Sequence, residues 1–593
     1  MGNSNPKSDG RFLSNLYFRV LPAQIFLLLL TRINNIVDGL VGSNFLGPKA
    51  MSIIGLYSPF QLVWVAVGNI LVVGSQVLCA RYMGAGDLKR TRGVFSLDIT
   101  IALAAASFGL LLSLALPAPI ALSLGASPAV LGDLSGYVIG RGFGLIPMVL
   151  GAQLAAFLTL EGQDKRNYIA AGAMLAVNAA MDLFFVRVIK MGVLGLGIAT
   201  SLSQWISMIA AGIFFLTKRA SLKYSFKGII WKEFWAILKV GFPSAIIFFL
   251  TSVQSGLFNN LLAVYDPTMM AVAAMSTYAL ASMIFESVGK GVAATGRLLT
   301  SVCYGEEDGR SITSVMKTVF TKGLLITLGS AVITFMMADF VAGLFYADHA
   351  SKVFKLTADA MRLGAAVLIL ETIAAIFSNY FQAIGRTAIV TVMSVLEGLF
   401  AMLPVGLLLI PRMGVHGSMI TYLVGYAIVA LCGPVYAILF WKRIPRTLSE
   451  WVTIPEDFGA AEDERLDASI HSLEEAMTIS SEVQKFCEKR NVSEKKAYYS
   501  ALALEELCLG IIKDRFEADK KKHTIEVRVL HKGEDIFMSL KDDCKPYNPQ
   551  ERADFIDPKD DSPKSMSIRL FMGIVKETEY RLTLGINVFT VTV

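Results

Sequence analysis

The chain has 593 residues, of which 54% are hydrophobic and only 17% charged, and its mean hydropathy is +0.56. Because an ordinary soluble protein carries about 25% charged residues, this composition excludes a single soluble globular domain. The charge is also unevenly placed: residues 1–450 carry a formal net charge of +13 and residues 451–593 one of −7, within a total of +6. The sequence therefore predicts two unlike parts.

Twelve apolar stretches fill most of the sequence before residue 442, and each is long enough to cross a bilayer, which takes about 20 residues. A large soluble core is the alternative, but it would leave too little polar surface to cover so many apolar stretches. We therefore predict an all-α polytopic membrane domain with twelve transmembrane helices. The stretches lie at roughly 16–40, 51–80, 93–117, 134–160, 168–186, 192–217, 236–262, 270–300, 318–346, 357–383, 388–411 and 415–441.

Lysine and arginine are unevenly shared between the two sets of connections. The set on the side of the N-terminus carries twenty of them, and the opposite set carries seven. Since positively charged loops are retained in the cytoplasm, we expect a multi-pass protein of the plasma membrane, or cell inner membrane, with both termini cytoplasmic. No cleavage site follows the first stretch, so that helix is expected to be retained. Six scattered cysteines and five histidines indicate neither a disulfide framework nor a zinc site.

The membrane part contains an internal repeat. At an offset of 221 residues, Pro22 pairs with Pro243, Gly84 with Gly305, and Asp87 with Asp308, while near the end of each half the offset becomes 222. We predict two six-helix halves, residues 1–225 and 226–445. Because six is even, the halves have the same orientation and are related by an axis along the membrane normal, as in transporters, with a central cavity between them.

A few polar side chains interrupt the predicted spans of the first half. Asp38 lies in the first span, Asn178 and Asp182 lie one helical turn apart in the fifth, and Thr200 lies in the sixth. Two carboxylates, an amide and a hydroxyl are hard oxygen donors that can hold a small cation, and a desolvated carboxylate can exchange protons. The alternative is that these groups only cross-link helices.

The second half also carries ionisable residues within its spans. Glu286, Lys290 and Arg297 share the eighth span at spacings of four and seven, and Glu371 and Glu397 lie in the tenth and eleventh. Glu286, Glu371 and Arg297 are candidates for lining a cavity in this half. A self-neutralising stripe of charges is the alternative.

Four segments carry a family resemblance: NIVDGLVG at 35–42, AMSIIGLYSP at 50–59, ARYMGAGD at 80–87 and GVLGLGIAT at 192–200. Together with the helix count and the repeat, they resemble the MATE family of multidrug and toxic-compound exporters, over about residues 15–441. The resemblance implies an antiporter, not an enzyme, that expels organic and often cationic compounds in exchange for Na⁺ or H⁺.

The resemblance also implies a coupling site. One branch of the family binds the coupling ion through an aspartate of the first helix, an Asn and Asp four apart in the fifth, and a Thr of the sixth; Asp38, Asn178, Asp182 and Thr200 fall on those positions. Another branch uses a glutamate of the seventh helix, and the stretch at 248–253 offers none. The tenth-helix acid of that branch is matched by Glu371.

The tail begins with a charged linker at 446–465, and the pattern of 466–593 predicts an α+β domain. Its helix SALALEELCLG at 500–510, its loop DDCKPYNP at 542–549 and its ending at 579–593 resemble the histidine-kinase-like ATPase fold in its anti-sigma-factor kinase form. Glu506 and the adenine-reading Asp542 are kept. The Mg²⁺ ligand and three glycines of that family are replaced by Gly510, Cys544, Ser565 and Ser567, which argues against ATP hydrolysis or kinase activity.

A degenerate regulatory or nucleotide-sensing tail is therefore our interpretation, and a generic small α+β domain is the alternative. For the whole chain we expect a multidrug antiporter whose partners are small organic substrates, the bilayer and, through the tail, a cytoplasmic regulatory protein, with no nucleic acid and no cofactor beyond the coupling ion. A flippase for a lipid-linked precursor and a membrane-tethered sensor are the alternatives. The flippase would use a basic cavity, for which the sequence offers Arg32, Arg141, Lys290 and Arg297.

Overall fold

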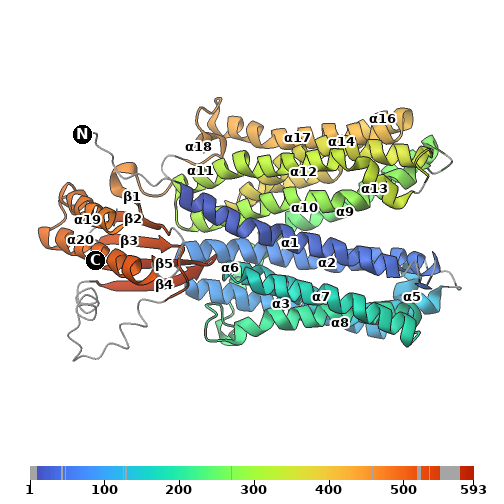
Figure 1. Cartoon of the computed structure of the whole chain (residues 1–593), viewed down its shortest axis with the longest axis horizontal. Helices are drawn as coiled ribbons and strands as arrows, with labels where there is room; N and C mark the ends of the chain where they lie inside the picture. Colours follow the sequence, from blue (N-terminus) through green and yellow to red (C-terminus); the bar gives the residue numbers. More distant parts are fainter. Residues whose placement is uncertain are drawn as a thin grey trace.

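The computed structural model describes most of the chain, and the ranges it describes are 10–41, 45–46, 48–124, 126, 128, 130–266, 268, 270–346, 348–455, 458–516, 523–532, 535–547 and 575–593. Among these residues, twelve helical segments are long and apolar enough to cross a membrane. The predicted fold class is confirmed: a polytopic helical membrane domain carries a smaller C-terminal domain at one end (Figure 1). We call the end of the membrane domain that touches the C-terminal domain the tail-side end, and the opposite one the distal end.

The first half begins with three long helices, and its fourth span is built from two consecutive helices. The bounds are α1 (Arg11–Val41), α2 (Pro48–Gly84), α3 (Leu88–Ala115), the short α4 (Pro117–Ser123), α5 (Leu131–Gly142), α6 (Leu145–Leu160), α7 (Asp164–Leu183) and α8 (Gly192–Gly212). Pro22 lies inside α1. A π-helical turn, Phe184–Val188, extends α7.

The second half repeats this order. Its helices are α9 (Phe234–Tyr265), α10 (Met270–Gly305), α11 (Gly309–Thr318), α12 (Leu324–Met336), the short α13 (Ala338–Phe345), α14 (Lys352–Ala383), α15 (Thr387–Val395), α16 (Leu403–Met413) and α17 (Val415–Trp441). A π-helical turn, Val319–Gly323, joins α11 to α12. A second one, Leu396–Phe400, lies between α15 and α16. The two halves form separate layers in Figure 1.

The halves meet mainly through three helix pairs, α1 with α10, α2 with α9 and α2 with α10. Glycines allow the backbones to approach closely there: a side chain at Gly241 of α9 would collide with the carbonyl of Ile70, and one at Gly74 of α2 would collide with that of Ile237. Since only glycine lacks a Cβ, these positions fix how near the halves can come.

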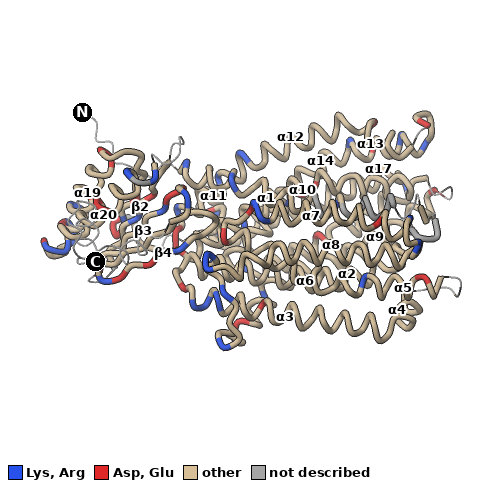
Figure 2. The backbone as a smooth tube through the Cα atoms, turned by 60° about the horizontal axis from the view of Figure 1, so that its bottom comes forward, with Lys and Arg blue, Asp and Glu red and all other residues tan. Residues whose placement is uncertain are grey.

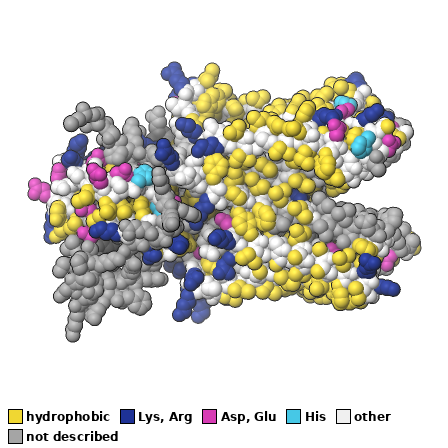
Figure 3. Space-filling view, viewed as in Figure 1, with side chains coloured by type: hydrophobic (Ala, Val, Ile, Leu, Met, Phe, Trp, Pro, Cys, Tyr) yellow, Lys and Arg dark blue, Asp and Glu magenta, His cyan; other side chains and the backbone are white. Residues whose placement is uncertain are grey.

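At the tail-side end, the contact between halves follows the repeat. A side chain at Gly84 would meet the carbonyl of Val302, and one at Gly305 would meet the carbonyl of Arg81, which is the same contact with the halves exchanged. The Arg81 guanidinium crosses to the second half and donates to the carbonyl oxygens of Ala383 at 2.7 Å and Gln382 at 2.9 Å. The tail-side end is therefore closed, whereas Figure 3 shows the molecule hollowed between the halves at the distal end.

Residues 448–455 pack against the membrane domain. After α18 (Leu448–Trp451), Val452 is 1% exposed within the main membrane-domain core, and its carbonyl accepts a hydrogen bond from Tyr380 Oη at 2.5 Å. Arg386 donates to the carbonyl of Thr453 at 2.9 Å. This part of the expected linker is thus held in place.

The described residues of the C-terminal domain form a five-stranded antiparallel sheet with two helices. Its elements are β1 (Arg465–Ile470), α19 (Leu473–Glu488), α20 (Glu494–Arg515), β2 (Ile525–Lys532), β3 (Asp535–Asp542), β4 (Glu577–Thr583) and β5 (Ile586–Thr592), in the spatial order β1-β2-β3-β5-β4. Side chains alternate between the two faces of a strand. Val527, Leu540 and Val591 accordingly belong to one core with residues of α19 and α20 such as Ile479 and Leu504.

Candidate functional site

The polar residues predicted in the first half lie on packed helices. Asn178 and Asp182 are both fully buried on α7, and Thr200, 1% exposed, lies on the neighbouring α8. The spacing of four on a continuous helix places the amide and the carboxylate on one face. Asp38 lies on α1, which packs against α7, but its side chain lies outside the described part of the structure.

Asn178 is the most informative of these residues. Neither its amide nitrogen nor its amide oxygen has a hydrogen-bond partner among the described residues. Burying an amide without partners is costly, so the site has unused polar capacity beside the Asp182 carboxylate. Carboxylate, amide and hydroxyl oxygens are donors that suit Na⁺ or a hydrated proton, and this donor set fits the predicted coupling ion.

In the second half, a lysine joins two of the predicted acids. Lys290 Nζ lies 2.7 Å from a carboxylate oxygen of Glu286 and 3.2 Å from one of Glu371, so α10 and α14 are bridged. Ser282 donates to the other oxygen of Glu286 at 2.7 Å. The Lys290 side chain is nevertheless 43% exposed. The lysine is thus accessible although it lies within a membrane span, which is expected of a cavity wall, while the Glu371 side chain behind it is only 9% exposed.

Arg297 lies apart from that cluster. Its guanidinium donates to the amide oxygens of Gln76 at 3.1 Å and Gln382 at 3.3 Å, and Gln382 in turn donates to the carbonyl of Val240 at 2.7 Å. Gln76 belongs to the first half and Gln382 to the second. Arg297 therefore joins the two halves instead of completing a site with Glu286 and Glu371.

Two further carboxyl groups lie in the membrane domain: Asp98, which the sequence analysis did not single out, and Glu397, to which it assigned no role. Asp98 of α3 is fully buried, and Ser75 of α2 is the side chain closest to pairing with it. The sequence feature that could have identified Asp98 is an acidic residue inside the apolar stretch at 93–117. Glu397, in the π-helical turn after α15, lies within electrostatic range of Lys290 and so borders the second-half cluster.

In the C-terminal domain, Asp542 ends β3 and is 2% exposed. One carboxylate oxygen accepts hydrogen bonds from Asn587 Nδ2 at 2.8 Å and the Cys544 amide at 3.0 Å, and the other accepts from Tyr547 Oη at 3.0 Å. Burial raises its pKa, while these hydrogen bonds lower it in part. Both oxygens are therefore engaged by the domain itself.

The other tail residues are dispersed. Glu506 is half-buried on α20, Gly510 is exposed on the same helix with open space around it, and no contact joins Glu506 to Asp542 among the described residues. Ser565 and Ser567 lie outside the described residues. Asp542, the residue predicted to bind the adenine amino group, thus lies inside a hydrogen-bond network in which two side chains and one backbone amide donate to it.

Comparison with known proteins addresses the membrane domain. Residues 22–184 match the MatE family model. The chain is 25% identical over 406 residues to the multidrug export protein MepA of Staphylococcus saprophyticus, covering 68% of this chain and 88% of that protein. It is 23% identical over 431 residues to MepA of Staphylococcus aureus, covering 70% of this chain and 93% of that protein.

Solved structures agree with these relatives. A multidrug-resistance MATE family transporter of the MOP superfamily in an outward-facing conformation superposes with a TM-score of 0.67 at 20% identity, covering 72% of this chain and 97% of that one. The membrane domain has the MATE transporter fold. A MOP superfamily transporter from Pyrococcus furiosus, whose binding pocket is described as reversed in polarity, also superposes on this MATE fold with a TM-score of 0.67 at 20% identity, over 74% of this chain and all of that one.

Proposed function

We propose that this protein is a secondary active multidrug antiporter that exports organic, often cationic, compounds in exchange for H⁺ or Na⁺. The MATE fold and the export proteins it resembles support the transport class. The observation that carries the coupling half of the proposal is the buried pair of Asn178 and Asp182, in which the amide has no hydrogen-bond partner among the described residues. Its oxygen is available to a cation or to a protonated carboxyl group.

The second-half cluster is the proposed contact for the organic cation. Three carboxylates, Glu286, Glu371 and Glu397, lie within electrostatic range of two cations, Lys290 and Arg32, so the cluster as a whole is negative when all five groups are ionised. A negative cluster favours cationic over anionic compounds. The same charges speak against a flippase for a pyrophosphate-linked lipid, because Lys290 is already paired with carboxylates.

We propose that the tail-side end faces the cytoplasm. Figure 2 shows Lys and Arg gathered along the tail-side ends of the helices and on the C-terminal domain, with fewer at the distal end. That distribution is typical of the cytoplasmic side. The closed tail-side end and the hollow at the distal end would then correspond to an outward-facing state.

For the C-terminal domain we propose a regulatory role without ATP hydrolysis. An adenine amino group would have to share Asp542 with Asn587, Cys544 and Tyr547, which already donate to its two oxygens, at a residue that is only 2% exposed. A cytoplasmic protein or a nucleotide bound elsewhere on the domain remains compatible with this proposal.

The coupling site is tested with proteoliposomes under an imposed H⁺ or Na⁺ gradient and a cationic dye as the cargo. Asp182→Asn keeps the size of the side chain but removes its charge, and gradient-driven dye movement should fall at least about a hundredfold, as expected for loss of a group that takes part in each cycle. The matched control is Asp339→Asn, at an acid whose side chain is 61% exposed near the distal end. Undiminished transport in Asp182→Asn would contradict the assignment.

A further inference from the structure

The sheet of the C-terminal domain has a second face, opposite α19 and α20, that points to the membrane domain. Arg528 alternates with the core residues Val527 and Val529 on β2, and Lys541 follows the core residue Leu540 on β3. Ile586 and Val588 of β5 belong to the main core of the membrane domain, not to that of their own domain. We call this the docking face: Arg528, Lys541, Arg581, Ile586 and Val588.

The docking face contacts the first half through the β4–β5 hairpin. Arg581 donates to the carbonyl of Gly84 at 3.0 Å, where α2 turns into α3. At the tip, the Leu584 amide donates to the carbonyl of Leu160 at 2.9 Å, at the end of α6. Gly162 and Gly585 both have positive φ and lie so close that a side chain at Gly162 would collide with the Gly585 backbone. The hairpin tip thus fits one short loop of the first half.

The docking face contacts the second half through the loop between α10 and α11. Lys541 Nζ lies 2.5 Å from a carboxylate oxygen of Glu306, and Arg528 pairs with Asp308. The Glu306 and Asp308 side chains are 8% and 2% exposed. Burial by itself raises the pKa of Asp308, but Arg528 and Lys541 hold that pKa below its usual value, so the pair is ionised near neutral pH.

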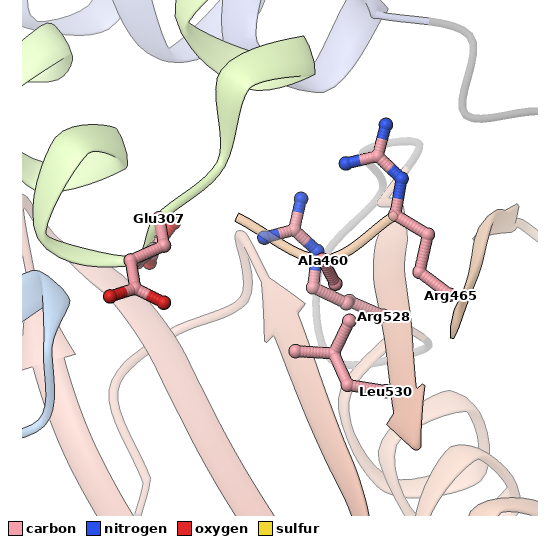
Figure 4. Close-up of a pocket in the computed structure, with 6 residues that line it drawn as sticks. Glu307, Ala460, Arg465, Arg528 and Leu530 are labelled. Carbon is pink, nitrogen blue, oxygen red and sulfur yellow. The ribbon is translucent and has the colours of Figure 1, made fainter. Parts of the chain in front are cut away.

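Figure 4 shows this second contact from the side of a small pocket. Arg528 of β2 and Arg465 of β1 extend from the sheet, and Glu307 stands on the loop across from them. Arg310, in the first turn of α11, lies 3.4 Å from Asp467 of β1. Charges of opposite sign therefore face each other across the contact.

Two of the three contacted loops, the one between α2 and α3 and the one between α10 and α11, are copies of one another. Gly84 and Gly305, and Asp87 and Asp308, are equivalent in the 221-residue repeat, and each aspartate caps the helix that follows by accepting a hydrogen bond from a backbone amide. One rigid sheet thus holds the same loop of each half, at the end where the halves are closed.

We propose that the C-terminal domain is a state-selective clamp, which binds both halves only while the tail-side end is closed and must leave at least one of them before that end opens. Alternating access moves one half against the other. Opening would draw Gly84 and Leu160 away from Glu306 and Asp308, and a single sheet cannot follow both pairs. A domain that binds only the closed state shifts the equilibrium toward it by its difference in affinity.

This inference goes beyond the proposed function, and its test measures distances instead of transport. Spin labels placed by Lys223→Cys in the first half and Lys317→Cys in the second, both exposed at the tail-side end, report the opening by pulsed electron resonance on the full chain. The background carries Cys432→Ser, because the other five cysteines are buried. A second label pair, Lys317→Cys with Lys485→Cys on α19, reports whether the domain is docked.

Two substitutions weaken docking. Lys541→Glu places a negative charge opposite Glu306, and Arg581→Ala removes the hydrogen bond to the Gly84 carbonyl. Each should raise the population of long distances in both label pairs several-fold, and the exchanged pair Glu306→Lys with Lys541→Glu should restore the short distances. Lys513→Glu, at an exposed residue of α20, is the charge-matched control and should change neither pair.

Hydrogen exchange of the β2 and β3 amides identifies variants in which the domain is unfolded, and those are replaced by Lys541→Gln. The inference is overturned if the domain undocks while the tail-side distances stay short, or if Lys541→Glu together with Arg581→Ala leaves the domain docked. It is supported if undocking and opening rise together and the exchanged pair reverses both.

Discussion

At the scale of single residues, the coupling site and the tail carboxylate are opposites. Asn178 is buried with its amide atoms unused, whereas Asp542 is buried with both oxygens engaged. A buried polar group without partners indicates a place for a ligand, and a satisfied one indicates a structural role. The sequence spacing of Asn178 and Asp182 predicted their shared face because α7 is a continuous helix through both. It could not predict that Asn587 and Tyr547 donate hydrogen bonds to Asp542. Asn587 belongs to another strand, and the sequence motif assigned neither residue as a partner of that carboxylate.

The acid–base behaviour of Asp542 gives a pH prediction. Its folded-state pKa is raised by burial, so its ionisation opposes folding: the contribution to stability is full below the unfolded-state value, about 3.9, and is lost as pH rises through the folded-state pKa. Asp542→Asn should therefore flatten the fall in unfolding free energy of the C-terminal domain that begins as pH rises above about 4. Hydrogen exchange of the β3 and β5 amides in the full chain, corrected for the intrinsic rate, measures this. Equal pH slopes in the variant and the parent would contradict it.

At the scale of secondary-structure elements, glycines set the distance between helices of the two halves. The order and number of the spans could be predicted because apolar length and the repeat are local signals. The close approach of Gly84 and Gly305 to the opposite helix could not, although both glycines stood out in the repeat, because sequence does not show which helix lies across from them.

Gly305→Ala tests this close approach. The new Cβ would collide with the carbonyl of Arg81, a backbone atom that cannot move alone, so we expect a loss of about 1–3 kcal/mol in unfolding free energy. Gly329→Ala on α12 is the control, with nothing within 4 Å of the added atom. That change should be neutral or stabilise by up to about 1 kcal/mol, because alanine favours a helix interior. Thermal unfolding of the purified protein compares the two, and equal transition temperatures would refute the packing argument.

At the scale of the whole molecule, the chain is a membrane domain of the MATE transporter fold with a second domain docked across both of its halves. The two-part organisation could be predicted from composition and charge. The docking could not, because each of its contacts joins the tail-side end of the membrane domain to a residue far along the sequence, as for Leu160 with Leu584. The boundary between the two parts also lies later in the structure than the charge pattern suggests, because Val452 is buried in the core of the membrane domain.

Two truncations separate the docked domain from the segment that precedes it. A chain that ends after Ala461 keeps the contacts of Tyr380 with Val452 and of Arg386 with Thr453, so it should insert and retain at least about half of its transport; one that ends after Arg446 loses them and should be less stable by about 2–4 kcal/mol. Detergent-solubilised thermal stability and proteoliposome transport distinguish them. Equal stability of the two truncated chains would show that residues 447–461 contribute nothing to the membrane domain.

The bond between Gln76 and Arg297 joins equivalent positions of the repeat, 221 residues apart. In an assembly of two identical six-helix chains, each such position would face its own copy, so an arginine would meet an arginine and repel it. Because the two copies in this chain differ in sequence, an arginine of one half can lie against a glutamine of the other. Each side chain is now the partner of the other, so a substitution at either position changes the surroundings of its repeat equivalent.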